Sequence, residues 1–260
     1  MTRLRLIVAI FLMACGCRSA DKDANTSEIS SAPGTEKTAT GRVYGIESAT
    51  IVIERTMTFP GRAGKPMVMT STETQRFADW GQKEIVVDGK LQIGTMKILD
   101  PKTTVIYTGL LHTNIDHKTQ SGTQTMMKKQ RRGGVVDVGA MINAKGRLGA
   151  KQDLERIGLE LLPDEEIAGV RCHVVKQIGR NHSTMWIYKG LMLKVDAPIK
   201  ANDRSPKASH RTISFEQGVK HGPEVFAVPE GIKLGAPMTE EERIQSARER
   251  LEAHTKKRNK

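Results

Sequence analysis

The chain has 260 residues, of which 27% are charged and 4% are aromatic, and its formal net charge is +12. This length suits one domain with a substantial core, and three cysteines are too few for a disulfide framework. So basic a chain suits anionic lipids, acidic partners or nucleic acid, but it holds no nucleic-acid motif with interleaved aromatic residues. We therefore expect anionic partners at a membrane surface and exclude nucleic acid.

Residues 1–14 have the pattern of a signal peptide. After a short basic start, the apolar run LIVAIFLMA (6–14) is too short to span a bilayer as a helix, which needs about 20 residues. Leu12-Met13-Ala14-Cys15 resembles a bacterial lipobox, in which the signal is cut before the cysteine and the cysteine is acylated. Cys17 is a rival site, but Ala14, three positions before it, is a weaker match. We predict lipidation at Cys15.

Lipidation would place the protein in the bacterial cell envelope. Each buried methylene contributes about 0.8 kcal/mol, so more than one acyl chain on Cys15 anchors firmly. Gly16 follows, whereas Asp at that position retains lipoproteins in the inner membrane of enteric bacteria, so the outer membrane is favoured over the inner membrane. A disulfide or metal pair between Cys15 and Cys17 is disfavoured by their tight spacing and by the lack of further ligands nearby.

The rest of the chain divides into three parts. Residues 15–40 carry the acylated cysteine and then a run rich in Ser, Thr and Ala, which predicts a flexible tether. Residues 41–235 predict a β domain, and residues 236–260 predict a charged C-terminal helix. The tether would let a periplasm-facing domain stand off the membrane.

Within the β domain, TIVIERTMTF (50–59) shows the clearest alternation. Ile51, Ile53, Met57 and Phe59 fall on one side, and the other side is mostly polar, with Thr50, Val52, Glu54, Thr56 and Thr58; this period of two is typical of a half-buried strand. Further strands are predicted at 68–80, 83–89, 102–116 (one or two strands), 171–179, 182–196 and 210–218, with a turn at PGRAGKP (60–66). Short strands at this spacing favour an antiparallel sheet or an open barrel.

Two segments depart from this pattern. Residues 131–170 hold many glycines, and the helix-like spacing of Leu154, Ile157 and Leu161 predicts loops with one or two short helices. In the tail, Thr239 and Glu242 form a capping box, acidic residues fill the first turn and basic residues gather at the end. The apolar stripe is narrow, which favours a solvated, lightly packed helix over a basic contact with lipid.

Three segments carry a family resemblance. They are YGIESATIVIERT (44–56), QRFADWGQKE (75–84) and the stretch 166–196, where a GxxC strand (Gly169 to Cys172) precedes WIYKGLMLK (186–194). In this order they resemble uncharacterised bacterial envelope proteins with a LolA/LolB-like fold, the fold of outer-membrane lipoprotein carriers. The resemblance covers most of residues 42–200. It implies a mainly β domain with some α: a curved antiparallel sheet, an unclosed half barrel, wrapped around a few helices.

The resemblance also implies a ligand, because carriers with this fold hold acyl chains in an apolar concavity. Taken as one strand, residues 185–195 are apolar on both faces, and such a strand needs cover on each side. The alternative is that a helix or loop covers the second face and the core is filled. Twelve methionines suit either an adaptable pocket or an ordinary core. The candidate groove lining is Met185, Trp186, Ile187, Tyr188, Leu191, Met192 and Leu193.

Enzyme signatures are absent from the sequence, which lacks a G-x-S-x-G elbow, an H-E-x-x-H motif and a phosphate loop. We therefore expect no catalytic residue, metal or cofactor, and Cys172 is expected to be a small buried hydrophobe. His112 and His117 flank Asp116 in a segment that predicts a solvated turn. Two functions compete: an anchored lipoprotein that binds a lipid or an acylated partner, and a structural or protein-interaction lipoprotein with a filled core.

Overall fold

The computed structural model describes residues 42–258, apart from 60–65, 94–95, 99–102, 128–136, 180–182 and 198–206. All of the described residues belong to one unit, Lys37–Lys260. The predicted signal peptide, Cys15, Cys17 and the tether lie outside the described residues, as does most of the predicted 60–66 turn. Those predictions stay predictions.

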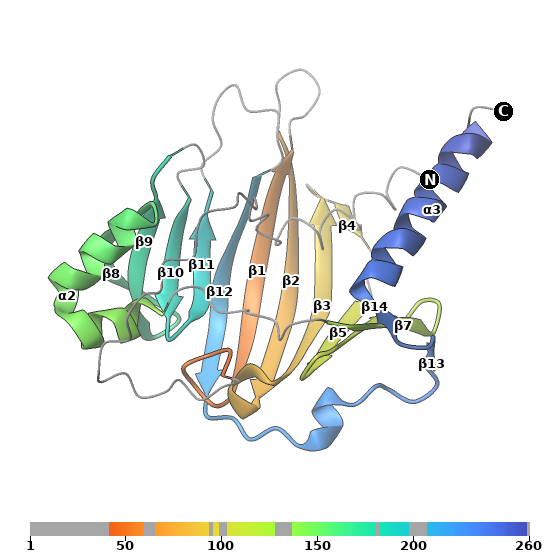
Figure 1. The fold of residues 1–260 in the computed structure, drawn as a ribbon, viewed down its shortest axis with the longest axis horizontal. Helices are drawn as coiled ribbons and strands as arrows, with labels where there is room; N and C mark the ends of the chain where they lie inside the picture. The colour runs from red at the N-terminus through yellow and green to blue at the C-terminus, as the bar shows by residue number, and fades with distance from the viewer. Residues whose placement is uncertain are drawn as a thin grey trace. The chain divides into compact units, whose positions relative to one another are not determined.

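One sheet dominates the described part of the chain (Figure 1). Its strands are β1 (Ala49–Phe59), β2 (Met67–Ala78), β3 (Lys83–Ile93), β4 (Met96–Ile98), β5 (Thr103–Thr108), β6 (Leu111–Asp116), β7 (Ser121–Met126), β8 (Leu159–Ile167), β9 (Val170–Gln177), β10 (Thr184–Tyr188), β11 (Leu191–Asp196), β12 (Lys207–Gln217), β13 (Lys233–Leu234) and β14 (Met238–Thr239). The helices are α2 (Val138–Arg156) and α3 (Glu240–Arg258), and two short 3-10 turns are η2 (Asp79–Gly81) and η3 (Pro223–Phe226).

The predicted fold class, a mainly β unclosed sheet with some helix, is confirmed. The strand order is β13-β7-β6-β5-β3-β2-β1-β12-β11-β10-β9-β8, and among the described strands the two ends do not pair with each other. The sheet is mixed rather than purely antiparallel, because β13 and β14 run parallel to β7. Each of these parallel contacts pairs only two residues of a chain that returns along the sheet edge from η3.

Strand β1 lies in the middle of the sheet and confirms the predicted alternation. Ile51, Ile53 and Met57 are 5% exposed or less. All eleven residues of β1 pair with β2, and its other side pairs with β12 with one register shift. Because β1 pairs with β2 on one side and with β12 on the other, its inward side chains lie beside residues that are far away in the sequence.

The prediction of one strand over residues 185–195 is wrong. The segment is a hairpin of β10 and β11, joined by a turn at Lys189 and Gly190. Both turn residues have positive φ angles, 46° and 79°, as the tight hairpin turns that match strand twist require. Asn-Gly or Asp-Gly would have signalled this turn, but lysine in the first position does not.

The glycine-rich centre also differs from its prediction. Helix α2 runs over nineteen residues, with Asp137 as its N-cap and a non-helical Gly146 in the middle. Strand β8 follows where only loops and helix were expected, and β7 was not predicted. The sequence LELLPDEEI hides β8, because Pro163 and four acidic residues interrupt its apolar pattern. Such residues are typical of an edge strand, which is where β8 lies.

Three apolar clusters stabilise the described fold. The first joins segment 43–46, β1, β2 and the hairpin, and the second lies between α2 and β8–β10. The third packs η3 against β3, β5 and β6. Val174 and Val175 belong to different clusters, as do Trp186 and Ile187, so β9 and β10 are covered on both faces.

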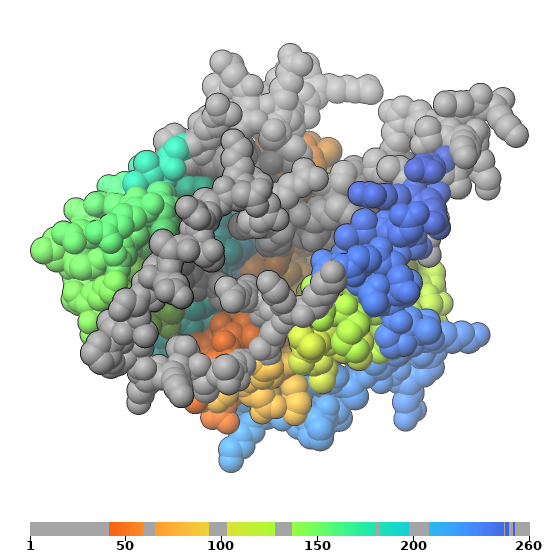
Figure 2. Space-filling model, viewed as in Figure 1, coloured from red at the N-terminus to blue at the C-terminus, as the bar shows by residue number. Residues whose placement is uncertain are grey.

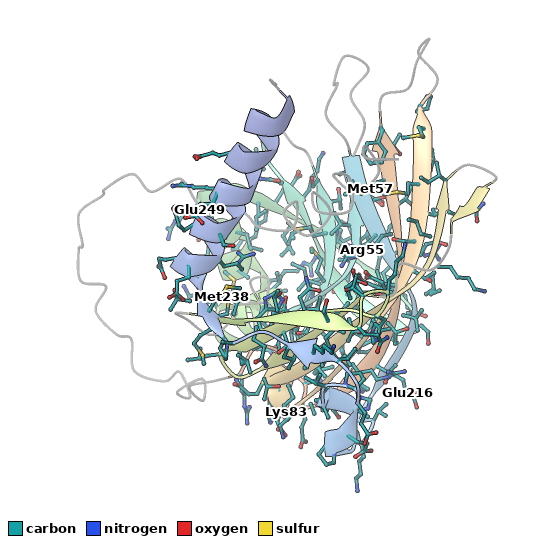
Figure 3. All side chains as sticks on the ribbon, turned by 90° about the vertical axis from the view of Figure 1, so that its right-hand side faces the viewer. Arg55, Met57, Lys83, Glu216, Met238 and Glu249 are labelled. Atoms are coloured by element: carbon teal, nitrogen blue, oxygen red, sulfur yellow. The ribbon has the colours of Figure 1, made fainter. Side chains whose placement is uncertain are left out.

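The charged C-terminal helix is present as predicted. The Thr239 hydroxyl accepts from the Glu242 backbone N–H at 3.2 Å, and the Glu242 carboxylate accepts from the Thr239 backbone N–H at 2.7 Å. This is the predicted capping box. Among the described strands, helix α3 packs mainly against β14 and β7, and it stands away from β1–β3 (Figure 3).

Candidate functional site

Strand pairing aligns the inward side chains of β1 with side chains of β12, β2 and β3, and the aligned side chains form rows across the sheet. We call this surface the inner face. Its rows are Ala208–Met57–Met69–Ile93, then His210–Arg55–Ser71–Leu91, then Thr212–Ile53–Glu73–Asp88. Figure 3 shows Arg55 and Met57 on the side of the sheet on which α3 stands, with the strands nearest α3 curving around that side. An apolar row therefore borders directly on charged rows.

The charged rows contain a close ion pair. Arg55 Nη2 lies 2.6 Å from Glu73 Oε1, and Glu73 is only 7% exposed. Next to Glu73 in its row, Asp88 accepts a hydrogen bond from the Thr103 hydroxyl. Burial raises the pKa of Asp88 above its ordinary value, although the Thr103 hydrogen bond opposes this shift.

His210 completes the charged rows from β12. Burial lowers the pKa of His210 from 6.5 to about 4, so its ring is neutral near pH 7. Nε2 lies 3.1 Å from the Met192 carbonyl oxygen, and an N–H at this position donates to that carbonyl. The neutral ring therefore fits this environment, and a charged ring does not.

The end of the inner face near the start of β1 is filled. Tyr44 donates its hydroxyl hydrogen to Glu84 Oε2 at 3.0 Å, and Gln75 Nε2 donates to Glu84 Oε1 at 3.0 Å. The Tyr44 ring packs on Phe77 with 4.6 Å between ring centroids. Glu84 is only 1% exposed, so this buried carboxylate is held by hydrogen bonds rather than by solvent.

The seven predicted groove residues do not lie together on one surface. Trp186, Tyr188, Leu191 and Leu193 pack in the first cluster, whereas Met185 and Ile187 pack in the second, under α2. Met192 is half-buried and lies opposite Ile187 in the hairpin. Met185 pairs with Val195, which pairs with His210, so the register extends the row of Arg55 to this one predicted residue. That these residues contact an acyl chain stays a prediction.

Cys172 lies in the first cluster and is fully buried. Burial raises the pKa of its thiol to about 11, so the thiolate is scarce near pH 7. We expect no reaction of Cys172 with a thiol reagent in the folded protein and complete reaction in urea. The measurement is labelling with dithiobisnitrobenzoate, with Cys15 and Cys17 replaced by serine so that Cys172 is the one thiol present. Rapid labelling without urea would contradict this assignment.

Other types of site are not found in the part of the chain that the structure describes. No group of three His, Cys, Asp or Glu side chains there is arranged to hold a metal ion. No helix in that part is long and apolar enough to span a membrane. The inner face, with its apolar row beside charged rows, is the surface that sequence reasoning missed. Arg55 at an inward position of β1 was the available signal for it.

The fold and the inner face define a class: an unclosed β scaffold with an amphipathic concave side. No protein-family model matches the chain, and no curated protein matches it. Among solved structures, it is similar to an uncharacterized conserved protein from Thermus thermophilus, with 9% identity and a TM-score of 0.39. That match covers 71% of this chain and 90% of the other chain.

Two further solved structures resemble the chain. The MucA/MucB complex of Pseudomonas aeruginosa matches with 9% identity and a TM-score of 0.38, covering 74% of this chain and 59% of that one. A LolA superfamily protein from Nitrosomonas europaea matches with 12% identity and a TM-score of 0.30, covering 72% and 93%. LolA superfamily structures are thus among the matches, as the sequence motifs predict.

Proposed function

We propose that the protein is a non-enzymatic, lipid-anchored envelope protein that holds a lipid or an acylated partner against the inner face of its sheet. The observation that carries this proposal is the apolar row Ala208–Met57–Met69–Ile93 directly beside the charged rows. An amphipathic ligand needs both, because its chain gains from apolar contact and its polar end needs hydrogen-bond partners. Methionine side chains adapt to chains of different shape.

The anchor in this proposal is Cys15, acylated after removal of residues 1–14. Residues 15–40 then tether the domain so that it faces the periplasm, with the outer membrane favoured over the inner one. The full chain has a net charge of +12, and loss of Arg3 and Arg5 with residues 1–14 leaves about +10, which supports a place beside anionic lipid head groups.

A structural or protein-interaction role is the second candidate. It is supported by the burial of the β10–β11 hairpin, in which Trp186, Ile187, Leu191 and Leu193 are all 5% exposed or less. In that case the core is filled and the chain takes up no small amphipathic ligand. The two candidates differ in whether the inner face binds a fatty acid.

Fatty-acid binding is tested with neighbouring substitutions on opposite faces of β2. Met69 belongs to the inner face, whereas Val68 is 41% exposed and points the other way. We expect Met69→Gln to weaken binding of a fluorescent fatty acid about tenfold, and Val68→Gln to leave it unchanged. Equal affinities for both variants, or no binding by the parent, would leave the structural role as the better account.

The anchor is tested separately by metabolic labelling with palmitate in a bacterial host. We expect label to be lost in Cys15→Ser and kept in Cys17→Ser. The reverse result would move the anchor to Cys17, and label in neither chain would show that no lipid is attached.

A further inference from the structure

A hollow lies where β1 begins, at the end of the sheet away from Met57. Four segments border it: residues 45–48, the η2 turn, the β10–β11 turn and the chain just after β12. Its volume is about 450 Å³. Figure 2 shows the chain before β1 (orange) and the turn after β2 (gold) side by side at the lower surface. No feature of the inner face accounts for this hollow.

Main-chain hydrogen bonds join the four segments. Gly45 donates to the Lys189 carbonyl at 2.8 Å, Trp80 donates to the Glu47 carbonyl at 2.9 Å, and Gly218 donates to the Ser48 carbonyl at 2.9 Å. Glycine at position 45 suits this approach, because a Cβ there would lie 3.0 Å from Lys189 Cβ, closer than most such contacts. The walls are therefore built by the backbone and do not depend on a ligand to form.

The walls also hold unfavourable backbone conformations. Asp79, Trp80 and Lys189 have φ angles of 52°, 58° and 46°, which non-glycine residues rarely adopt. Trp80 and Lys189 line the hollow itself. Such residues persist where surrounding contacts hold them, and they gather at binding sites.

The polar side chains around the hollow are mainly hydrogen-bond donors, and two of them are positively charged lysines. Lys189 and Lys220 line it, and neither ammonium group forms an ion pair with another described residue. Tyr188 donates its hydroxyl hydrogen to Gln217 Oε1 at 3.0 Å, which leaves the Gln217 amide NH₂ as a donor. Glu47 is the one acidic residue in the lining, and the Arg42 guanidinium lies 3.7 Å from the centre of the Trp80 ring. The Asp137 carboxylate lies close to Gly45, but the lining itself, with two lysines and one glutamate, carries a net positive charge.

We propose that this hollow binds a phosphate group, either on a lipid head group or as the free ion. Lys189 and Lys220 supply charge, and Gln217 and Ser48 supply neutral donors. Phosphate oxygens accept from several donors at once and favour such a preformed, positively charged wall. The site is distinct from the inner face, so phosphate binding here does not depend on whether the inner face binds a fatty acid.

The test uses the full chain with Cys15→Ser and Cys17→Ser, so that no anchor carries it to lipid. Inorganic phosphate and a short-chain, soluble phosphatidylglycerol are titrated separately by calorimetry. We expect binding of at least one of them, accompanied by a change in Trp80 fluorescence. Binding of phosphate alone assigns the free ion, and binding of the lipid alone assigns the head group.

The variant is Lys189→Asn with Lys220→Gln, since asparagine tolerates the positive φ angle of the turn. We expect its affinity to fall about tenfold or more, with its thermal unfolding unchanged. The matched control is Lys90→Gln with Lys118→Gln, which removes the same charge from two exposed sites elsewhere. Equal weakening in the control, or no binding of either probe by the parent, would overturn the proposal.

Discussion

Replacing Arg55 by methionine is expected to cost about 3 kcal/mol of unfolding free energy at pH 7. The substitution keeps much of the side-chain volume but leaves the Glu73 carboxylate buried without the guanidinium that lies 2.6 Å from it. Removing one partner of a buried pair costs more than the pair contributes, because the remaining charge is then desolvated and unpaired. The measurement is urea unfolding followed by circular dichroism.

The double variant separates charge burial from packing. With Arg55→Met and Glu73→Met together, the Glu73 charge is removed along with its partner, and we expect recovery to within about 1 kcal/mol of the parent. Lys83→Met is the control, because Lys83 pairs with Asp79 on the surface and should cost about 0.5 kcal/mol or less. A double variant as unstable as Arg55→Met would contradict the account of the inner face.

Acidification from pH 6.5 to 4 is expected to remove up to about 3 kcal/mol of stability through His210. Its pKa is about 4 in the folded protein and near 6.5 when unfolded. Between these values the unfolded chain binds a proton that the folded chain does not, so stability falls as the pH falls. Asp88, whose pKa is raised by burial, acts with the opposite sign.

The variant that tests this is His210→Gln, whose amide can still donate to the Met192 carbonyl. We expect the loss of stability between pH 6.5 and 4, measured by urea unfolding at each pH, to shrink by most of its size. His117→Gln is the matched control, because it leaves His210 in place and should keep the loss. If His210→Gln lost as much stability between pH 6.5 and 4 as the parent does, groups other than His210 would be the cause of that loss.

Local patterns in the sequence were enough for much of the fold. Ile51, Ile53 and Met57 revealed β1, and Thr239 with Glu242 revealed the start of α3. Strand β8 stayed hidden because its edge position permits Pro163 and a run of acids. The β10–β11 turn stayed hidden because Lys189 takes a conformation that neighbouring contacts impose, which no local rule predicts for lysine.

The candidate sites depend on register and so were harder to predict. His210 comes beside Arg55 only because β12 returns to pair with β1 across a long stretch of chain. The hollow that Lys189 and Lys220 line likewise needs four segments to meet. Sequence alone can place Arg55 on an inward position of its strand, but it cannot name the residues that lie opposite.

The most direct test of the central claim is native mass spectrometry of residues 21–260, exported without the anchor and purified without detergent. The account predicts an extra mass that denaturation releases as a fatty acid or phospholipid, and that Met69→Gln reduces. A mass equal to the bare chain, with no uptake of added lipid, would contradict ligand binding on the inner face.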